Sequence, residues 1–457
     1  MSNFNHKVVD ANINIIKEKR RVIYQLLIWI ILMSILVLGW VINSNITKLV
    51  VILLTSLFYI TVKADVKFYM LLFCLPYIKF IRIGNEGFST FNVWLVILLI
   101  NLLLYKPKVK SLQLILFIAL ISVVSINLNN MAITTYLAWI LNVLIVFFVC
   151  GCDYPTNKFS FSIVKSVLFL CSGFLSSSIL GYLIRIFMPG KIEFFKTLTA
   201  ITGQLDIMIM RFTGLMHDPN YFAQGILLCI ASLFVLLINY QGISNKEVIG
   251  ILCLLVSLII FGLISYSKMY VLTLLLLLTV CITYIFITNK VRTIIRFIIV
   301  CFLLLMLFFA INSLFMKDIL DIILYRFNNS SDLSTGRLTI LENAIDVVLQ
   351  QPGILLFGVG IGSSIVQYFG SALHNVYFES VMSFGIIGSI FWCMFLYSIY
   401  SNKKIIKNTD LISFTRYLPA AIIFITGFSL DGIWADWYYF YLVFSINVMK
   451  MEFNQTS

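Results

Sequence analysis

An integral membrane protein built only from helices, with about 14 transmembrane spans, is predicted by two features of this sequence. Of its 457 residues, 61% are hydrophobic and only 11% are charged, whereas an ordinary soluble domain carries about 25% charged residues. The apolar residues also fall into runs of about 20, the length that crosses a hydrocarbon core. The chain therefore lacks the polar residues needed to cover a soluble domain of useful size.

The predicted spans begin after the basic segment 17–21. The first apolar run lacks a small-residue cleavage site, so we expect it to be retained as a span, with the amino terminus in the cytoplasm. The expected spans are residues 22–42, 46–62, 66–83, 91–105, 111–128, 131–150, 162–188, 220–238, 247–264, 269–288, 297–315, 376–400, 411–430 and 437–449. Pro76 interrupts the third span, the fourth is short, and the close pair 247–264 and 269–288 has a re-entrant alternative.

This map divides the chain into seven parts. They are a cytoplasmic tail (1–21), spans 1–7 (22–188), an outer loop (189–219), spans 8–11 (220–315), a large outer loop (316–375), spans 12–14 (376–449) and a second cytoplasmic tail (450–457). It places 21 of the 32 Lys and Arg on the cytoplasmic side and 12 of the 19 acids outside, as the positive-inside rule requires. The basic excess is therefore a topology signal, and we expect no nucleic-acid partner.

The two longest polar segments, 189–219 and 316–375, both fall on the outer side, so function is expected there. Within the second, Leu338, Leu341, Ile345 and Val348 recur at helical spacing. This pattern predicts an amphipathic helix over residues 336–350 that lies at the membrane surface. The Pro352-Gly353 pair is expected to end it.

Polar residues of the first outer segment precede a predicted span. Asp218 and Asn220 flank a proline, and both residue types are common at turns and helix starts; contact with a substrate is the alternative. The guanidinium of Arg211 is suited to bidentate hydrogen bonds with a lipid phosphate, each worth about 1.5–3 kcal/mol. Ordinary head-group binding is the alternative for this arginine.

The second outer segment carries Arg337 at the start of the amphipathic helix and ends in His374-Asn375, where Asn375 is a candidate substrate contact. A positive side chain beside a helix amino terminus favours an anion. An imidazole is the side chain most readily poised for proton transfer near neutral pH, which makes His374 a catalytic candidate. His217 competes with it, and an interfacial histidine without a chemical role is the plainer interpretation of both.

Charges near the ends of the predicted spans suggest where an anion would bind. Lys79, Arg82 and Arg185 all fall toward outer ends, and almost no charge falls near a midplane. This distribution weakens the case for a proton- or ion-coupled transporter, because such proteins place charges inside the membrane. It favours an anion-binding zone at the outer leaflet, with Arg185 as a candidate phosphate contact.

The last outer turn, residues 431–436, is suited to sugar hydroxyls. Asp431 and Asp436 lie there beside Trp434 and Trp437. The alternative interpretation is a pair of solvated carboxylates next to interfacial tryptophans.

No cofactor or metal site is expected. Gly358-Val-Gly360-Ile-Gly362 lacks the spacing, the preceding strand and the following helix of a dinucleotide-binding fingerprint. The sequence has no Asp-x-Asp pair and no His, Asp or Glu cluster with metal-ligand spacing. We therefore predict metal-independent chemistry.

The ordered motifs of residues 211–390 resemble those of the O-antigen ligase and polymerase superfamily. The motifs are Arg211-x-x-Gly214, Asp218-Pro219-Asn220, Thr335-Gly336-Arg337, Pro352-Gly353, Gly358-Val-Gly360-Ile-Gly362, His374-Asn375-x-Tyr377 and Gly385-x-x-Gly388. Each motif is weak alone, but the ordered set with a long outer loop before the histidine is fairly specific. Upstream, the chain resembles the superfamily only in the number and hydropathy of its spans.

The resemblance implies a metal-independent glycosyltransferase at the outer face of the cytoplasmic membrane. Its donor would be an undecaprenyl-diphosphate-linked glycan, bound through the diphosphate by Arg211 and Arg337, with His374 as the catalytic residue. We favour a polymerase that joins repeat units of O-antigen or capsular polysaccharide with inversion. Its partners would be membrane lipids and the chain-length regulator and flippase of the same pathway. Alternatives are an O-antigen ligase, a lipid-linked oligosaccharide flippase and a non-catalytic assembly partner.

Overall fold

The computed structural model describes most of the chain as a bundle of helices. Its described residues are 2–82, 89–155, 159–188, 211–216, 218–239, 245–288, 302, 306, 324, 337–401, 411–430 and 432–450, with backbone alone at residues 2–20, 245, 285, 286, 288, 337 and 411–413. No strand occurs in this part of the chain, where the only β-type pairing is an isolated bridge between Lys108 and Asp153. The predicted all-α class is confirmed.

Helices coincide with 13 of the 14 predicted spans; the eleventh, 297–315, lies almost entirely outside the described residues. The first ten spans correspond to α1 (Ser2–Val41), α2 (Asn45–Thr61), α3 with η1 (Ala64–Cys74 and Leu75–Phe80), α4 (Thr90–Leu104), α5 (Ser111–Ser125), α6 with η3 (Ile133–Ile145 and Val146–Gly151), α7 (Ile163–Phe187), α8 (Pro219–Asn239), α9 (Asn245–Ile264) and α10 (Lys268–Thr288). The last three correspond to α16 (Val376–Tyr400), η5 with α17 (Leu411–Tyr417 and Leu418–Gly427) and α18 (Asp436–Lys450). Six described helices are long and apolar enough to cross a membrane, which fits a membrane protein; the count of 14 stays a prediction.

The third span is irregular where its proline predicted a break. α3 ends at Cys74, and a 3₁₀ helix, η1, continues from Leu75 with Pro76 in its first turn. Proline has no amide hydrogen and its ring clashes with the preceding turn, so an α-helix cannot continue through it unchanged. The indole of Trp40 donates to the carbonyl of Phe80 at 2.9 Å and fixes the end of η1. This turn carries Lys79 and leads directly to Arg82.

α16 is broken in its middle, and a glycine-rich loop packs into the break. Gly385 has φ +67°, a left-handed backbone that side chains other than glycine rarely adopt. The amides of Val359 and Gly360 donate to the carbonyls of Met382 and Ser383 at 2.8 and 3.1 Å. Because the helix is interrupted at Gly385, these two carbonyls cannot accept the hydrogen bonds of a regular α-helix. The amides of the loop donate to them instead. The glycine motif therefore has a structural role.

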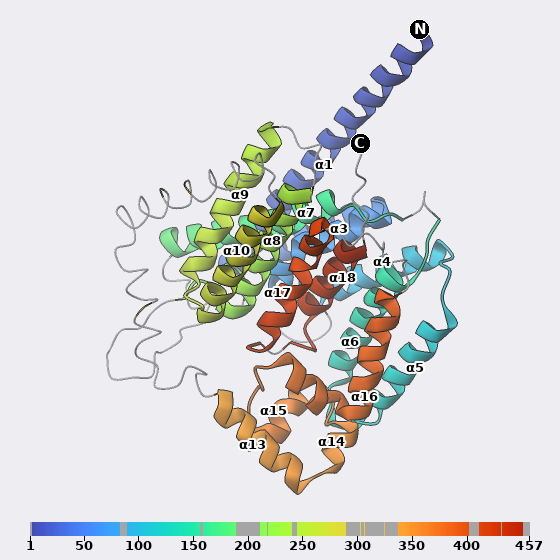
Figure 1. The fold of residues 1–457 in the computed structure, drawn as a ribbon, viewed down its shortest axis with the longest axis vertical. Coiled ribbons are helices and arrows are strands. Elements are labelled where there is room, and N and C mark those ends of the chain that lie inside the picture. The colour runs from blue at the N-terminus through green and yellow to red at the C-terminus, as the bar shows by residue number, and fades with distance from the viewer. Residues whose placement is uncertain are drawn as a thin grey trace.

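Three short helices form a separate layer at one end of the bundle. They are α13 (Arg337–Gln350), α14 (Gly353–Phe357) and α15 (Ser363–Phe369), and in Figure 1 they lie at the end opposite the projecting amino-terminal part of α1. The predicted helix 336–350 is confirmed as α13. Val348 of its predicted apolar face packs with Ala344 against α14–α16, while Leu338 and Ile345 are 59% and 44% exposed. The position of this helix at the membrane surface stays a prediction.

We expect Gly385→Ala to lower the stability of the fold by about 2–4 kcal/mol, because a Cβ would strain the left-handed backbone and meet the carbonyl of Leu356. The apparent melting temperature of the purified protein in detergent measures this loss. Gly250→Ala is the matched control, because a Cβ there meets no atom within 4 Å. Equal melting temperatures for the two variants would show that the break in α16 is not strained.

Candidate functional site

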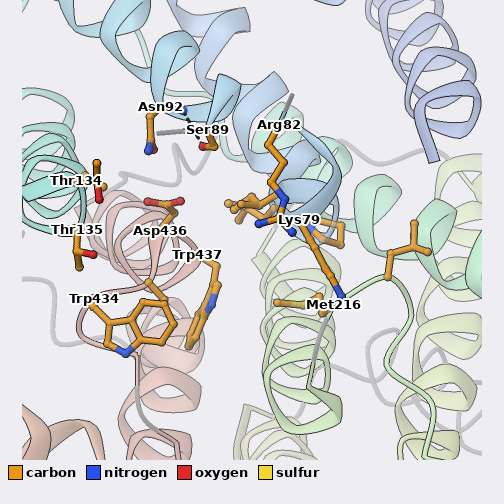
Figure 2. A pocket seen from close by; sticks show the side chains of 16 residues that line it. Lys79, Arg82, Ser89, Asn92, Thr134, Thr135, Met216, Trp434, Asp436 and Trp437 are labelled. Carbon is orange, nitrogen blue, oxygen red and sulfur yellow. Dashed lines mark hydrogen bonds between the residues drawn. The ribbon is translucent and has the colours of Figure 1, made fainter. Parts of the chain in front are cut away.

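A cavity of about 490 Å³ lies between η1, the start of α4, the start of α6 and the segment before α18. Figure 2 shows two unlike walls: Lys79 and Arg82 come from η1 and the residues after it, whereas Asp436, Trp434 and Trp437 come from the α17–α18 connection and the first turn of α18. Four hydroxyl or amide side chains complete the polar lining: Ser89, Asn92, Thr134 and Thr135. A single ligand in this cavity could therefore contact positive charges, aromatic rings and hydrogen-bonding side chains.

The basic wall carries two half-buried cations. No ion pair to Lys79 or Arg82 occurs among the residues that the structure describes, and the buried Nε of Arg82 has no hydrogen-bond partner. Burying a charged group without a partner is unfavourable, because the group loses water and gains no replacement contact. An anion in the cavity would provide the missing interaction for both side chains.

Asn92 gives the cavity a buried polar group with unused hydrogen-bonding capacity. The residue is 5% exposed, and its side-chain oxygen is buried without a partner. Its backbone amide is occupied, since it donates to the hydroxyl of Ser89, which caps α4. A ligand hydroxyl would supply the donor that this oxygen lacks.

The opposite wall combines a carboxylate with two indoles. The side-chain amide of Asn142 donates to one oxygen of Asp436 at 2.6 Å, and the structure shows no hydrogen bond to the other oxygen in the described chain. Trp437 packs against Tyr221 with ring centroids 4.8 Å apart, while Trp434 remains 38% exposed. The carboxylate is thus oriented by Asn142, and the indoles offer flat apolar surface beside it.

Glu379 connects the start of α16 to this wall. Its side chain is 2% exposed, and its Oε2 accepts hydrogen bonds from the amides of Gly432 and Ile433 at 2.8 and 3.2 Å. These contacts hold the loop that continues into Trp434 and Asp436. Sequence reasoning missed Glu379, although an acid in the first turn of a predicted span is the kind of signal that marks function.

Arg211, Asp218 and Asn220 form a hydrogen-bonded network beside the cavity. The guanidinium of Arg211 donates to the carbonyl of Ser265 at 3.1 Å and to the side-chain oxygen of Asn220 at 2.8 Å. Asp218 accepts from the amides of Asn220 and Tyr221 at the start of α8. The structure thus gives Asp218 the ordinary helix-start role, whereas the side-chain oxygen of Asn220 accepts from Arg211 and from the hydroxyl of Ser267, each at 2.8 Å. Contact of either residue with substrate stays a prediction.

The turn after Arg211 brings residues 215 and 216 to the cavity. Gly214 has φ +57°. Its carbonyl lies close to Gly181 of α7, and a Cβ on Gly181 would be only 2.6 Å from the carbonyl oxygen of Gly214. Leu215 and Met216 follow and form part of the cavity lining. Close packing of two glycines therefore places this segment against the wall that carries Lys79.

The predicted catalytic histidine lies at the start of α16, outside the cavity lining. His374 is half-buried with φ +49°, a conformation that costs energy for a non-glycine residue and is common at functional sites. The side chain of Asn375 caps α16 by accepting from the amides of Tyr377 and Phe378 at 3.0 Å. Asn375 therefore has a structural role, and its contact with substrate stays a prediction. Four residues separate His374 from Glu379.

The remaining predicted residues are not brought to the cavity. Arg185 is half-buried in the last turn of α7 and does not line it. His217, Asp431 and the side chain of Arg337 lie outside the described residues. Within the described chain, no group of three or more His, Cys, Asp and Glu side chains is arranged to hold a metal ion.

We expect Glu379→Ala to release the 430–435 loop, because each lost hydrogen bond to a charged acceptor is worth about 1.5–3 kcal/mol. Hydrogen–deuterium exchange at the amides of Gly432 and Ile433 should become at least about tenfold faster. Glu379→Gln should give an intermediate rate, since its side-chain oxygen still accepts. Glu342→Ala, on the exposed face of α13, is the control; wild-type exchange rates in Glu379→Ala would contradict the role of this carboxylate.

Comparison with known proteins identifies no relative of this chain: no family model, no curated protein and no solved structure matches it.

Proposed function

We propose that this protein is a membrane glycosyltransferase that joins lipid-linked oligosaccharide repeat units into O-antigen or capsular polysaccharide. The observation that carries the proposal is the cavity, where Lys79 and Arg82 face Asp436, Trp434 and Trp437. Cations suit a diphosphate, while indole faces and hydrogen-bonding side chains suit sugar rings and hydroxyls. A diphosphate-linked glycan carries both kinds of group in one molecule.

The proposed binding mode follows the two walls. The donor's diphosphate lies against Lys79 and Arg82, and Arg211, Arg337 and Arg185 are the further cations that the family resemblance or their position suggests. The sugar next to the diphosphate packs on Trp434 and Trp437, with Asp436 and Asn92 bonded to hydroxyls. The prenyl chain of an undecaprenyl carrier stays in the bilayer, at the outer face of the cytoplasmic membrane.

The proposed reaction transfers the glycan without a covalent enzyme intermediate. A hydroxyl of the acceptor attacks the anomeric carbon, the bond from that carbon to the diphosphate oxygen breaks, and the configuration inverts. The leaving diphosphate gains negative charge, which the cations stabilise. The base that takes the proton of the attacking hydroxyl is His374 according to the family resemblance, although this residue lies outside the cavity lining. Asp436 is the alternative base, because its carboxylate lies inside the cavity. No step needs a metal ion.

Within the same chemistry, a ligase would transfer a finished chain to another acceptor. A flippase would bind the same diphosphate but carry it between the two faces. Polymerisation is the preferred function because the Ile-, Lys- and Asn-rich composition and the 14 predicted spans fit a repeat-unit polymerase. A chain-length regulator and a flippase of the same pathway are the proposed partners.

The test is a gel ladder of surface glycan from cells that lack this protein, rescued with single variants at matched expression. We expect Arg82→Ala or Lys79→Ala to shorten the ladder and to lower transfer about ten- to hundredfold, the effect of one lost charge-assisted contact. Lys246→Ala, exposed at the start of α9, is the control. A normal ladder from Arg82→Ala would overturn the assignment of the cavity.

Two further variants separate the candidate bases. We expect His374→Ala to leave a single repeat unit on the lipid carrier, while Asp436→Asn keeps part of the activity. The reverse order would make Asp436 the base. Full-length chains retained on the carrier would indicate a ligase, and loss of the ladder with lipid-linked repeats trapped inside would indicate a flippase.

A further inference from the structure

A second basic cavity lies at the opposite end of α3. Asp65, in the first turn of α3, lines this cavity. The other end of α3 continues into η1, whose Lys79 lines the candidate site. The cavity measures about 420 Å³ and lies between α1, α3 and α7. The function proposed above makes no use of it, and the inference drawn from it is independent of that function.

Three cations surround this second cavity. Arg21 comes from α1, Lys63 immediately precedes α3, and Lys165 lies in the first turn of α7. One carboxylate, Asp65, faces the same space, so the cations outnumber the acids by three to one. The cavity therefore has the charge to hold an anion.

Two polar side chains in this cavity have unused hydrogen-bonding capacity. Gln25 is 8% exposed and makes no hydrogen bond within the described chain. The Oδ1 atom of Asp65 is buried and also lacks a partner. A ligand that combines an anionic group with hydroxyls would satisfy both, because its hydroxyls can donate to Asp65 and bond to Gln25.

An apolar chamber adjoins the basic one. It measures about 460 Å³, shares Arg21 and Gln25 with it, and is lined by Tyr24, Ile28, Phe58 and Val62. Neighbouring side chains on the same helix, Ile23 and Leu27, are 55% and 48% exposed, as expected of a surface that faces lipid. A ligand that filled both chambers would have an anionic head and an apolar tail.

The depth of the paired chambers also fits a lipid head group. Arg21 begins the apolar stretch Arg21–Val41 of α1, and Ile163 begins the apolar helix α7. Both mark the level at which the chain enters the hydrocarbon core, where lysine and arginine meet phosphates of the lipid. The map of positive residues places this end in the cytoplasm.

We propose that the chambers bind one anionic phospholipid with a hydroxyl-bearing head group, of the phosphatidylglycerol type. Its phosphate lies among Arg21, Lys63 and Lys165, its head-group hydroxyls bond to Asp65 and Gln25, and an acyl chain follows Ile28 and Phe58. The apolar chamber distinguishes this ligand from free phosphate, which has no group to fill it.

The experiment is native mass spectrometry of the full-length protein after reconstitution in vesicles of phosphatidylglycerol and phosphatidylcholine mixed equally. We expect one phosphatidylglycerol per chain to survive mild detergent washing. Lys165→Gln or Arg21→Gln should lower its occupancy at least about fivefold, the effect of a lost charge-assisted contact. Ile28→Trp, which fills the apolar chamber without changing charge, should lower it as well.

The matched control is Lys110→Gln, because this exposed lysine lies between α4 and α5 and lines none of the three cavities. Equal loss in Lys110→Gln, or equal retention of phosphatidylcholine, would overturn the proposal, since either result means non-specific association. Displacement of the lipid by millimolar inorganic phosphate, with Ile28→Trp unchanged, would make this a free-anion site and also overturn it. Variants are compared only where their melting temperatures without phosphatidylglycerol equal that of the wild type.

Discussion

Every break in a membrane helix exposes backbone groups that water cannot reach, and this constraint organises the described bundle. An unpaired amide or carbonyl in hydrocarbon costs several kcal/mol, so irregular backbone persists only where other groups bond to it or where it lines a cavity. α16 shows the first solution, because the amides of Val359 and Gly360 bond to its interrupted turn. α3 and η1 show the second, because the 3₁₀ turn after Pro76 ends at the candidate cavity.

The same constraint explains how the cavity is built from distant parts of the chain. The loop before α18 has amides that need an acceptor, and Glu379 supplies one carboxylate oxygen for two of them. Because Glu379 belongs to the first turn of α16, the capped helix start of Asn375 also determines where Trp434 and Asp436 lie. A contact that compensates for irregular backbone therefore also orients the side chains that face the cavity.

Positively charged side chains lie near both ends of α3, but the groups around them differ between the two ends. At one end Lys79 and Arg82 share a cavity with indoles and a carboxylate, the setting that we propose for a glycan. At the other end Arg21, Lys63 and Lys165 adjoin an apolar chamber beside exposed apolar residues, the setting that we propose for a phospholipid. The positive charges are alike, so the neighbouring groups determine the class of ligand.

The sequence by itself determined the all-helical membrane fold, because runs of about 20 apolar residues are stable in a bilayer only as helices. It also determined local features that depend on nearby residues, such as the break at Pro76, the helix α13 and the helix-start role of Asp218. The motifs alone pointed to Arg211 and His374, which the structure places outside the cavity lining. Only the tertiary structure joined Lys79 and Arg82 to Asp436, since more than 350 positions separate them and no periodic pattern encodes a contact between η1 and the start of α18. It also decided that Ala344, and not Leu338, faces the core, because the buried face of a helix depends on which neighbours pack against it.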